Sequence, residues 1–334
     1  MTRTAIVVGA GGFIGGHLVK RLLDEGTRVV GVDVKPRDHW HQVHSGALSM
    51  PLLDACWDDN NDDVNRYAGS VDEVYHLAAD MGGIGFIETH KARCMLSIRI
   101  TTGVLRAALK HNWGRVFYSS SACIYPVYRQ RDPNVVALRE DDAYPADPED
   151  GYGWEKLFGE RMHRHFTEDY GVETRVARYH NVYGPNGDWI GGREKAPAAL
   201  SRKMAEAELT GDHNITVWGD GEQTRSFTYV DDAVEGTLRL MRSDVRVPLN
   251  VGSGELVTIN QVLDLLETYS GITLQRHYDL GAPQGVRGRN SDNTLIKRYL
   301  EWEPMTPLSV GLERTYRWVY DQAKLISPQG SELP

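Results

Sequence analysis

The sequence predicts an α/β fold: a doubly wound parallel sheet followed by a smaller C-terminal α/β lobe. Continuous apolar runs such as TAIVVGA alternate with segments of helical spacing, which is typical of a parallel sheet with helices on both faces. A glycine-rich turn joins the first apolar run to the first helical segment. The length of 334 residues exceeds what one compact core usually holds and therefore favours a second lobe.

The elements follow in order along the first half of the chain. The first strand candidate is a continuous apolar run bounded by glycine, and the first helix candidate repeats apolar residues four apart at Ile14, Leu18 and Leu22. Strands are expected over residues 4–10, 28–34, 71–79, 114–121 and 173–184, and helices over 12–26, 91–111 and 152–168. The acidic, proline-rich stretch 130–151 is expected to be a loop. After residue 184 a glycine-rich loop leads into a helix, and residues 216–241 suggest strand, turn, strand and helix.

Composition excludes several classes of protein. The formal net charge is −9, so a broad basic surface for nucleic acid is not expected. No stretch approaches the roughly 20 apolar residues of a membrane span. Cys56, Cys94 and Cys123 are widely spaced and odd in number, which indicates neither a disulfide framework nor a zinc site. We therefore expect a cytoplasmic protein.

The glycine turn GAGGFIG predicts a dinucleotide site. Gly9, Gly12 and Gly15 would let the backbone approach a pyrophosphate at the start of the following helix. Asp33 ends the second predicted strand, where an acid can accept hydrogen bonds from the adenosine ribose. This favours NAD, although Lys35 and Arg37 leave NADP open and Asp33 could also be a solvated strand end. The first domain, Rossmann-like, is expected over 1–184 with segments near 220–255 returning to it, and the substrate lobe mainly over 185–334.

A tyrosine and a lysine follow at helical spacing. Tyr152 and Lys156 are four apart, which places them on one face of a helix. A nearby ammonium favours the phenolate, and a phenolate can take a proton from a substrate hydroxyl. Such a pair is common by chance, so its meaning depends on the preceding turn and on the serines of SSSA, residues 119–122.

Together, GxxGxxG, SSSA and YxxxK resemble the extended short-chain dehydrogenase/reductases. By that resemblance Ser121 supplies a hydroxyl, Tyr152 is the base and Lys156 modulates it. The stretch RSFTYVDD resembles the arginine-containing motif that these enzymes place near a substrate diphosphate.

Further motifs resemble the family of GDP-mannose 3,5-epimerases across nearly the whole chain, among them ADMGGIGF, SSACIYP and GGREKAPAALSRK. The resemblance implies NAD-dependent inversion of C3 and C5 of GDP-mannose through a 4-keto intermediate, giving GDP-L-galactose and, after one inversion, GDP-L-gulose. It makes Cys123 and Lys195 the acid/base pair. From the residues alone, Cys123 could be a small buried apolar side chain and Lys195 a solvated loop lysine. Cys56 and Cys94 are expected to be structural.

The candidate binding residues fall into two sets. Lys203, Arg225 and Arg287 could hold a diphosphate, since arginine binds phosphate oxygens in a bidentate way. Trp218 could line a base pocket or belong to the core, and the base itself is implied by resemblance only. The cofactor set is Gly9, Gly12, Phe13, Ile14, Gly15, Asp33, Asp54, Leu77, Ala78, Ala79, Tyr152 and Lys156. The substrate set is Gly82, Gly83, Ser121, Ala122, Cys123, Asn181, Glu194, Lys195, Ala196, Lys203, Trp218, Gln223, Arg225 and Arg287.

Two other functions stay open at this point. One is a C4 epimerase or 4,6-dehydratase of the same fold, although a dehydratase would normally carry an Asp–Glu pair where this chain has Ala122 and Cys123. The other is a non-catalytic NAD sensor, which could lose the tyrosine or the lysine that this chain keeps. A homodimer through helices 91–111 and 152–168 is the expectation from the fold.

Overall fold

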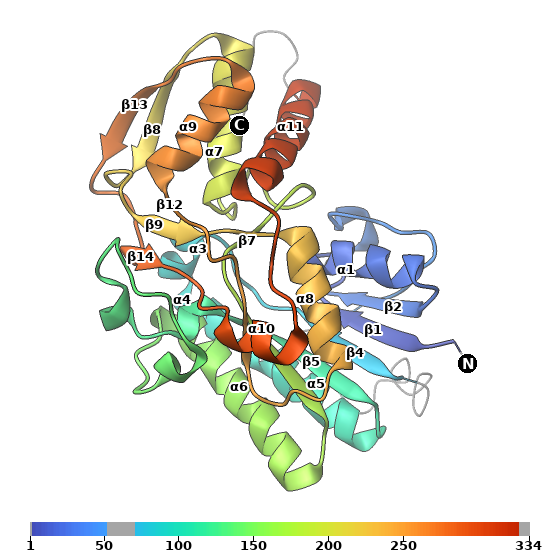
Figure 1. Cartoon of the computed structure of the whole chain (residues 1–334). Helices are drawn as coiled ribbons and strands as arrows, with labels where there is room; N and C mark the ends of the chain where they lie inside the picture. Colours follow the sequence, from blue (N-terminus) through green and yellow to red (C-terminus); the bar gives the residue numbers. More distant parts are fainter. Residues whose placement is uncertain (1, 52–70, 327–334) are drawn as a thin grey trace.

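The fold is built on a seven-stranded parallel sheet (Figure 1). The structure, a computed structural model, describes residues 2–51 and 71–326. The strand order is β11-β6-β5-β4-β1-β2-β3, so the order in which strands are added to the sheet reverses between β1 and β4. The predicted α/β fold is thus confirmed. The strands are β1 (Thr4–Val8), β2 (Arg28–Asp33), β3 (Leu48–Pro51), β4 (Glu73–His76), β5 (Arg115–Ser121), β6 (Thr174–Tyr179) and β11 (Leu249–Val251).

Helices cover both faces of this sheet. Alternate strand residues serve the two faces: Val7 packs in one apolar cluster with Leu18, whereas Val8 packs in another with Val104. The first cluster lies under α1 and α8, and the second lies under α5, with α6 beside it against β5. These helices are α1 (Phe13–Asp24), α5 (Ile98–Lys110), α6 (Asp150–Tyr170) and α8 (Val230–Arg242).

The helix expected over 91–111 is broken in the structure. α4 (Lys91–Met95) ends before Ser97, and α5 begins directly after it. The amide of Ser97 bonds to the carbonyl three residues back, at 3.2 Å, instead of four. Its hydroxyl accepts the amide N–H of Asp80 at 2.9 Å, which ties the break to the segment after β4. Periodicity alone could not show this contact, because it depends on tertiary packing.

The later part of the chain builds a smaller group of elements beside the carboxyl ends of the sheet (Figure 1). α7 packs against α9 and α11, and two small sheets, β12-β9-β14 and β13-β8, lie next to them. β7, β10, α8 and β11 instead lie with the main sheet and its covering helices. The division of the chain at residue 184 stays a prediction.

The remaining elements have the following bounds. They are α3 (Ile84–Thr89), β7 (Val182–Tyr183), α7 (Ala196–Thr210), β8 (Asn214–Trp218), β9 (Thr224–Ser226), β10 (Thr228–Tyr229), β12 (Leu256–Thr258), α9 (Ile259–Ser270), β13 (Gln275–Asp279), β14 (Gly288–Arg289), α10 (Thr294–Leu300) and α11 (Leu308–Ile326). Within residues 2–51 and 71–326, no helix combines the length and the apolar character needed to cross a membrane.

A buried ion pair ties α6 to the sheet. Arg178 of β6 makes two hydrogen bonds to the carboxylate of Glu160, at 3.0 and 2.8 Å. The same carboxylate accepts the hydroxyl of Ser120 at 2.5 Å, and Arg178 also donates to the carbonyl of Glu140 at 2.7 Å. Both charged side chains are almost fully buried, so each depends on the other for compensation.

We therefore expect Glu160→Gln to destabilise the fold by about 3–5 kcal/mol, because it leaves the guanidinium of Arg178 buried without its counter-ion. Glu168→Gln is the matched control on the same helix, since Glu168 pairs with Arg164 at the exposed surface. Thermal and denaturant unfolding measure both. Equal melting temperatures for the two variants would contradict the assigned importance of the buried pair.

Candidate active site

A cavity of 1050 Å³ opens at the carboxyl ends of the central strands. Residues directly after β1, β4, β5 and β6 line it, together with the start of α7 and parts of β9 and β14. Parallel sheets of this type bind ligands at this edge, beside the position where the strand order reverses. The volume is large enough for more than one nucleotide-sized ligand.

The glycine turn has the form that a pyrophosphate site needs. Gly9 has φ +92°, in the region that favours glycine, and its amide bonds to the carbonyl of Val32 at 2.7 Å. A Cβ on Gly15 would overlap the carbonyl oxygen of Gly9, so this position holds only glycine. α1 then begins with Gly12 as its N-cap, and its first residues, Phe13 and Ile14, line the cavity, which places the start of the helix where a phosphate can bind.

Asp33 is buried at the end of β2 and lines the cavity. One carboxylate oxygen accepts the amide N–H of Gly11 at 2.9 Å, and the other accepts that of Lys35 at 3.0 Å. Burial excludes the alternative of a solvated strand end. The acid thus holds the glycine turn and presents carboxylate oxygens to the cavity, which fits the ribose of NAD. Lys35 also lines the cavity, whereas Arg37 bonds to the carbonyl of His44.

The segment after β4 lies directly beside the glycine turn at this end of the cavity. Leu77 bonds to the carbonyl of Val8 at 2.8 Å, and a Cβ on Gly9 would lie 2.8 Å from the amide nitrogen of Ala78. Leu77, Ala78 and Ala79 all line the cavity, as expected of cofactor-binding residues. Asp54 lies outside the described residues, as does Cys56.

Ser121 and Cys123 lie together where β5 ends. Ser121 is the last residue of the strand, and its hydroxyl accepts the amide N–H of Cys123 at 3.2 Å, capping a short 3₁₀ turn over Ala122–Ile124. Cys123 is buried. Burial raises the pKa of its thiol, while the guanidinium of Arg289 acts in the opposite direction. This thiol is therefore a proton donor at neutral pH unless a ligand changes its surroundings.

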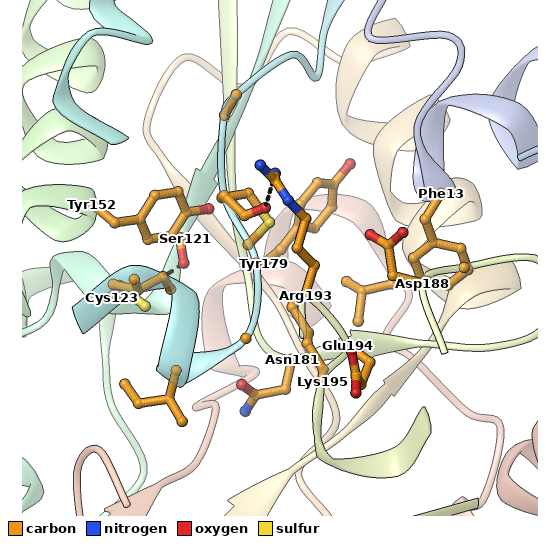
Figure 2. A pocket seen from close by; sticks show the side chains of 18 of the residues that line it. Phe13, Ser121, Cys123, Tyr152, Tyr179, Asn181, Asp188, Arg193, Glu194 and Lys195 are labelled. Carbon is orange, nitrogen blue, oxygen red and sulfur yellow. Dashed lines mark hydrogen bonds between the residues drawn. The ribbon is translucent and has the colours of Figure 1, made fainter. Parts of the chain in front are cut away.

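Tyr152 and Lys156 face the same end of the cavity from α6. The ammonium nitrogen of Lys156 lies 5.7 Å from the centre of the Tyr152 ring and 4.9 Å from that of Tyr118. Burial raises the pKa of the Tyr152 phenol well above its usual value, and the neighbouring hydroxyl of Ser121 acts against this. Figure 2 shows Tyr152, Ser121 and Cys123 grouped on one side of the cavity.

A close backbone contact sets this grouping. A Cβ on Gly153 would overlap the carbonyl oxygen of Cys123, and the amide of Glu149 bonds to that same carbonyl at 2.9 Å. A Cβ on Gly159 would overlap the hydroxyl of Tyr118. α6 therefore lies directly on β5 and its following turn, which brings Tyr152 to the serine and the cysteine.

Lys195 comes from the loop that precedes α7 and is the N-cap residue of that helix. Burial lowers the pKa of its ammonium; the thiol of Cys123 acts against this shift, whereas Arg289 adds to it. The three groups therefore share one electrostatic environment. Figure 2 shows Lys195 and Glu194 across the cavity from Cys123, so an amine and a thiol approach it from different sides.

Arg289 was missed by the sequence reasoning, although it lies at the centre of this site. It donates to the sulfur of Cys123 at 3.4 Å, to the carboxylate of Glu149 at 2.8 Å and to the amide oxygen of Gln130 at 2.6 Å. The only signal was its position two residues after Arg287 in GVRGRNS, where alternate strand residues share a face. Burial, which the motif does not show, separates the two arginines.

The structure places two of the three predicted diphosphate-binding cations at the cavity. Arg225 and Lys203 line the cavity. Arg225 is buried against backbone carbonyls, those of Thr224 at 2.7 Å, Gln284 at 3.1 Å and Val286 at 2.6 Å, and burial lowers its pKa to about 10. Its positive charge is thus hydrogen-bonded by neutral groups and suited to an anion.

Arg287 is placed elsewhere. It makes two hydrogen bonds to the carboxylate of Asp220, at 2.9 and 3.0 Å, and is not among the residues that line the cavity. Its charge is already compensated by that carboxylate, so the structure gives its predicted part in diphosphate binding no support.

Trp218 and Gln223 also line the cavity. Trp218 is 45% exposed and lines the cavity, so it is not a core residue. Gln223 donates to the carbonyl of Trp218 at 2.8 Å, while its own amide oxygen is buried without a hydrogen-bond partner. A buried hydrogen-bond acceptor without a partner costs free energy, so the amide oxygen of Gln223 would gain from a donor on a bound ligand. The exposed indole of Trp218 beside it could contact the ring of such a ligand.

The other predicted substrate residues also reach the cavity. Asn181 has φ 42° and donates to the carbonyl of Ser226 at 2.9 Å. A Cβ on Gly83 would overlap the carbonyl oxygen of Glu194, and its amide bonds to the carbonyl of Arg193 at 2.9 Å. The glycine therefore admits the loop that carries Lys195, in addition to any sugar. Gly82, Gly83, Ala122, Asn181, Glu194 and Ala196 all line the cavity.

The arrangement combines two kinds of chemistry. A glycine turn and a buried acid fit a dinucleotide at one end, and a serine, tyrosine and lysine set suits proton transfer during hydride transfer. A thiol and an amine beside this set add a second acid/base pair. Among the described residues, no group of three or more acidic, histidine or cysteine side chains could hold a metal ion.

Comparisons with known proteins agree with this site. The profile of the NAD dependent epimerase/dehydratase family matches residues 5–252. GDP-mannose 3,5-epimerase 1 of Oryza sativa subsp. indica is 45% identical over 98% of this chain and 84% of that protein. The GDP-mannose 3,5-epimerase of Arabidopsis thaliana is 43% identical over 98% and 85%.

A solved structure shares the whole architecture. The UDP-glucose 4-epimerase of Thermotoga maritima, determined with UDP-glucose, superposes with a TM-score of 0.83 at 26% identity, covering 96% of this chain and 99% of that chain. The match of the family profile to most of the chain, and the high identity of nearly full-length relatives, confirm the resemblance drawn from the motifs. The chain belongs to the NAD dependent epimerase/dehydratase family.

Proposed function

We propose that the protein inverts C3 and C5 of GDP-mannose through a 4-keto intermediate, giving GDP-L-galactose and, when only C5 is inverted, GDP-L-gulose. The observation that carries the proposal is the pairing of Cys123 and Lys195 at the cavity that also holds Ser121, Tyr152 and Lys156. An epimerase acting at C4 alone needs only the last three. The names of the rice and Arabidopsis relatives support the choice of substrate.

The first and last steps take place at C4. NAD, the cofactor of the family, would be held by the glycine turn and Asp33 and would supply the hydride acceptor and donor for C4. Tyr152 takes the proton of the C4 hydroxyl as hydride leaves, and Ser121 donates a hydrogen bond to the resulting carbonyl. The ammonium of Lys156 stabilises the phenolate of Tyr152. The burial that raises the pKa of the phenol makes this ammonium necessary.

The carbonyl at C4 acidifies the hydrogens on C3 and C5, because the resulting enolate is stabilised. Inversion then requires removal of a proton from one face of the ring and delivery from the other. Burial favours the neutral forms of both Cys123 and Lys195, a thiol that can give a proton and an amine that can take one. Arg289, hydrogen-bonded to the sulfur at 3.4 Å, stabilises the thiolate when the proton has left.

The diphosphate is assigned to the end of the cavity with Arg225 and Lys203. Burial lowers the pKa of both side chains, and in Lys203 the neighbouring Arg202 adds to that effect. Both cations line the cavity and would gain from a bound polyanion. This supports a nucleoside diphosphate sugar held with its hexose toward Tyr152.

A homodimer belongs to the same proposal. Met95, Leu96, Trp154 and Phe158 are 49%, 57%, 47% and 59% exposed, although all four are large and apolar. Trp154 and Phe158 are four apart on α6 and share a face, and α4 packs beside that helix. Apolar side chains gathered in this way favour burial against the same patch of a second copy.

The compartment is inferred from the cysteines. Cys94 and Cys123, the two that lie within the described residues, are both free thiols. Free thiols are usual in a reducing compartment, which supports the cytoplasm as the location.

Turnover in deuterium oxide tests the chemistry. Wild-type protein with GDP-mannose is expected to place deuterium at C3 and C5 of recovered substrate and products, measured by NMR and mass spectrometry. Cys123→Ala and Lys195→Ala are expected to slow this exchange by about 10²–10⁴-fold, because each removes one acid/base group. Both variants should still oxidise C4, seen as transient NADH absorbance.

Tyr152→Phe is the matched comparison for that experiment. It removes the base at C4 and should abolish both the transient NADH signal and the exchange. Turnover to a product that carries no deuterium at C3 or C5 would favour a C4 epimerase, because a hydride that leaves C4 and returns to it does not exchange with the solvent. Bound NAD without any turnover of GDP-hexoses would favour a sensor.

Variants of Arg225 and Arg287 distinguish a specific role in diphosphate binding from a general effect of positive charge. Arg225→Met should raise KM for GDP-mannose by about 10–100-fold, since a charge-assisted hydrogen bond contributes about 1.5–3 kcal/mol. Arg287→Met removes the same charge from a residue that pairs with Asp220 and should change KM less than about threefold. A larger effect at Arg287 would overturn the assignment.

The dimer is tested by mass in solution. Trp154→Glu with Phe158→Glu should convert the protein to a monomer, because two buried charges oppose the contact. Leu280→Glu is the control, an exposed leucine in the turn after β13, away from α6 (Figure 1). Sedimentation velocity or light scattering reads the result. A wild-type monomer, or a dimer unaffected by the double variant, would refute this interface.

A further inference from the structure

A buried polar cluster surrounds Lys156. Its nearest carboxylate belongs to the preceding residue: Glu155 Oε2 lies 3.6 Å from Lys156 Nζ, and the two side chains are 1% and 2% exposed. Neighbouring residues of a helix point in different directions, so a surface helix seldom buries both. α6 does so because α5 and β5 pack against it.

The carboxylate of Glu155 is incompletely hydrogen-bonded. One oxygen accepts the hydroxyl of Tyr118 at 3.4 Å, and the other is buried without a hydrogen-bond partner. An ionised carboxylate in such a place is costly unless an opposite charge compensates it. The ammonium of Lys156 is that charge.

The remaining titratable groups of the cluster are neutral or already paired. Burial lowers the pKa of His163 to about 4 and lowers that of His76, and in both cases the charge of Lys156 acts in the same direction. Glu160 is bound by Arg178. The titratable groups around Lys156, Tyr152 and Tyr118 are His76 from β4, Cys94 from α4, Cys123 from the turn after β5, and Glu155, Glu160 and His163 from α6.

We propose that Glu155 is a positioning residue: its carboxylate is the counter-ion that keeps Lys156 charged and held between the rings of Tyr118 and Tyr152. The inference rests on the proposed function in one respect, the assignment of Tyr152 and Lys156 to proton transfer at C4. Glu155 itself does not reach the substrate, since it is not among the residues that line the cavity.

The direction of the effect follows from the charges. Removing the negative charge of Glu155 leaves the ammonium of Lys156 buried without its nearest counter-ion. It also removes a like charge that opposes the phenolate of Tyr152. Activity needs the ammonium and the phenolate together, so both limbs of the pH profile should move toward lower pH. A charge within 4–6 Å shifts such midpoints by about 1–3 units.

The experiment compares Glu155→Gln with wild type in two measurements. The first is kcat/KM for GDP-mannose against pH, where the alkaline limb should fall at a pH lower by about one unit or more. The second needs no substrate: ionisation of Tyr152 in the NAD-loaded protein, taken as the ultraviolet difference from the same protein carrying Tyr152→Phe. Its midpoint should also move to lower pH. Glu168→Gln, on the exposed face of the same helix, should change neither.

The outcomes separate this inference from the proposed function. If wild type does not turn over GDP-mannose but the tyrosine midpoint shifts in Glu155→Gln, the substrate assignment fails and the role of Glu155 stands. If turnover is normal and both midpoints stay at wild-type values, the role of Glu155 is overturned. Should Glu155→Gln fail to fold, Glu155→Asp decides. Its carboxylate is one methylene farther back, so smaller shifts in the same direction support the role and unshifted midpoints overturn it.

Discussion

The site depends on one close contact, that of α6 with the backbone that follows β5. The contact requires glycine at residue 153, because any side chain there would overlap the carbonyl oxygen of Cys123. The same carbonyl accepts the amide of Glu149 at 2.9 Å, just before α6 begins. Ser121 ends β5, Cys123 follows in its turn, and Tyr152 precedes the glycine. This backbone contact therefore brings three groups from separate elements together, and the hydroxyl of Ser121 links them further by accepting the amide N–H of Cys123 at 3.2 Å.

The low polarity of the buried site then determines which of its ionisable side chains keep their charge. Where burial meets a matched partner, as for Arg289 with Glu149 at 2.8 Å, charge is retained and used to orient neighbours. Where burial is not matched by an ion-pair partner, the charged form is disfavoured; burial lowers the pKa of Lys195 and of Arg225, and the like charge of Arg289 adds to both shifts. The first situation suits positioning of the thiol of Cys123. The second suits a base and an anion site, because both gain when a ligand brings protons or negative charge.

Several elements could be read from the chain because local pattern and tertiary environment agree. The strands β1, β2, β4, β5 and β6 are almost entirely buried, β1 is a continuous apolar run, and each predicted range contains the observed strand. The broken helix at Ser97 was not predictable, since the break serves a hydrogen bond to Asp80 that lies far away in sequence. The sequence also did not show which of Arg287 and Arg289 belongs to the site. The two are alike in sequence, and only packing shows that one pairs with Asp220 while the other reaches Cys123.

By itself the sequence determined the parallel α/β sheet, the glycine turn with its acid, and the residue types of the proposed catalytic set, because these depend on local periodicity and on the chemistry of short motifs. Only the tertiary structure decided which charges are compensated, that the loop with Lys195 crosses Gly83, and that Glu155 shares the buried surroundings of Lys156. The reason is physical: burial and electrostatic environment are set by the distances between segments that the chain brings together, and no single segment contains those distances.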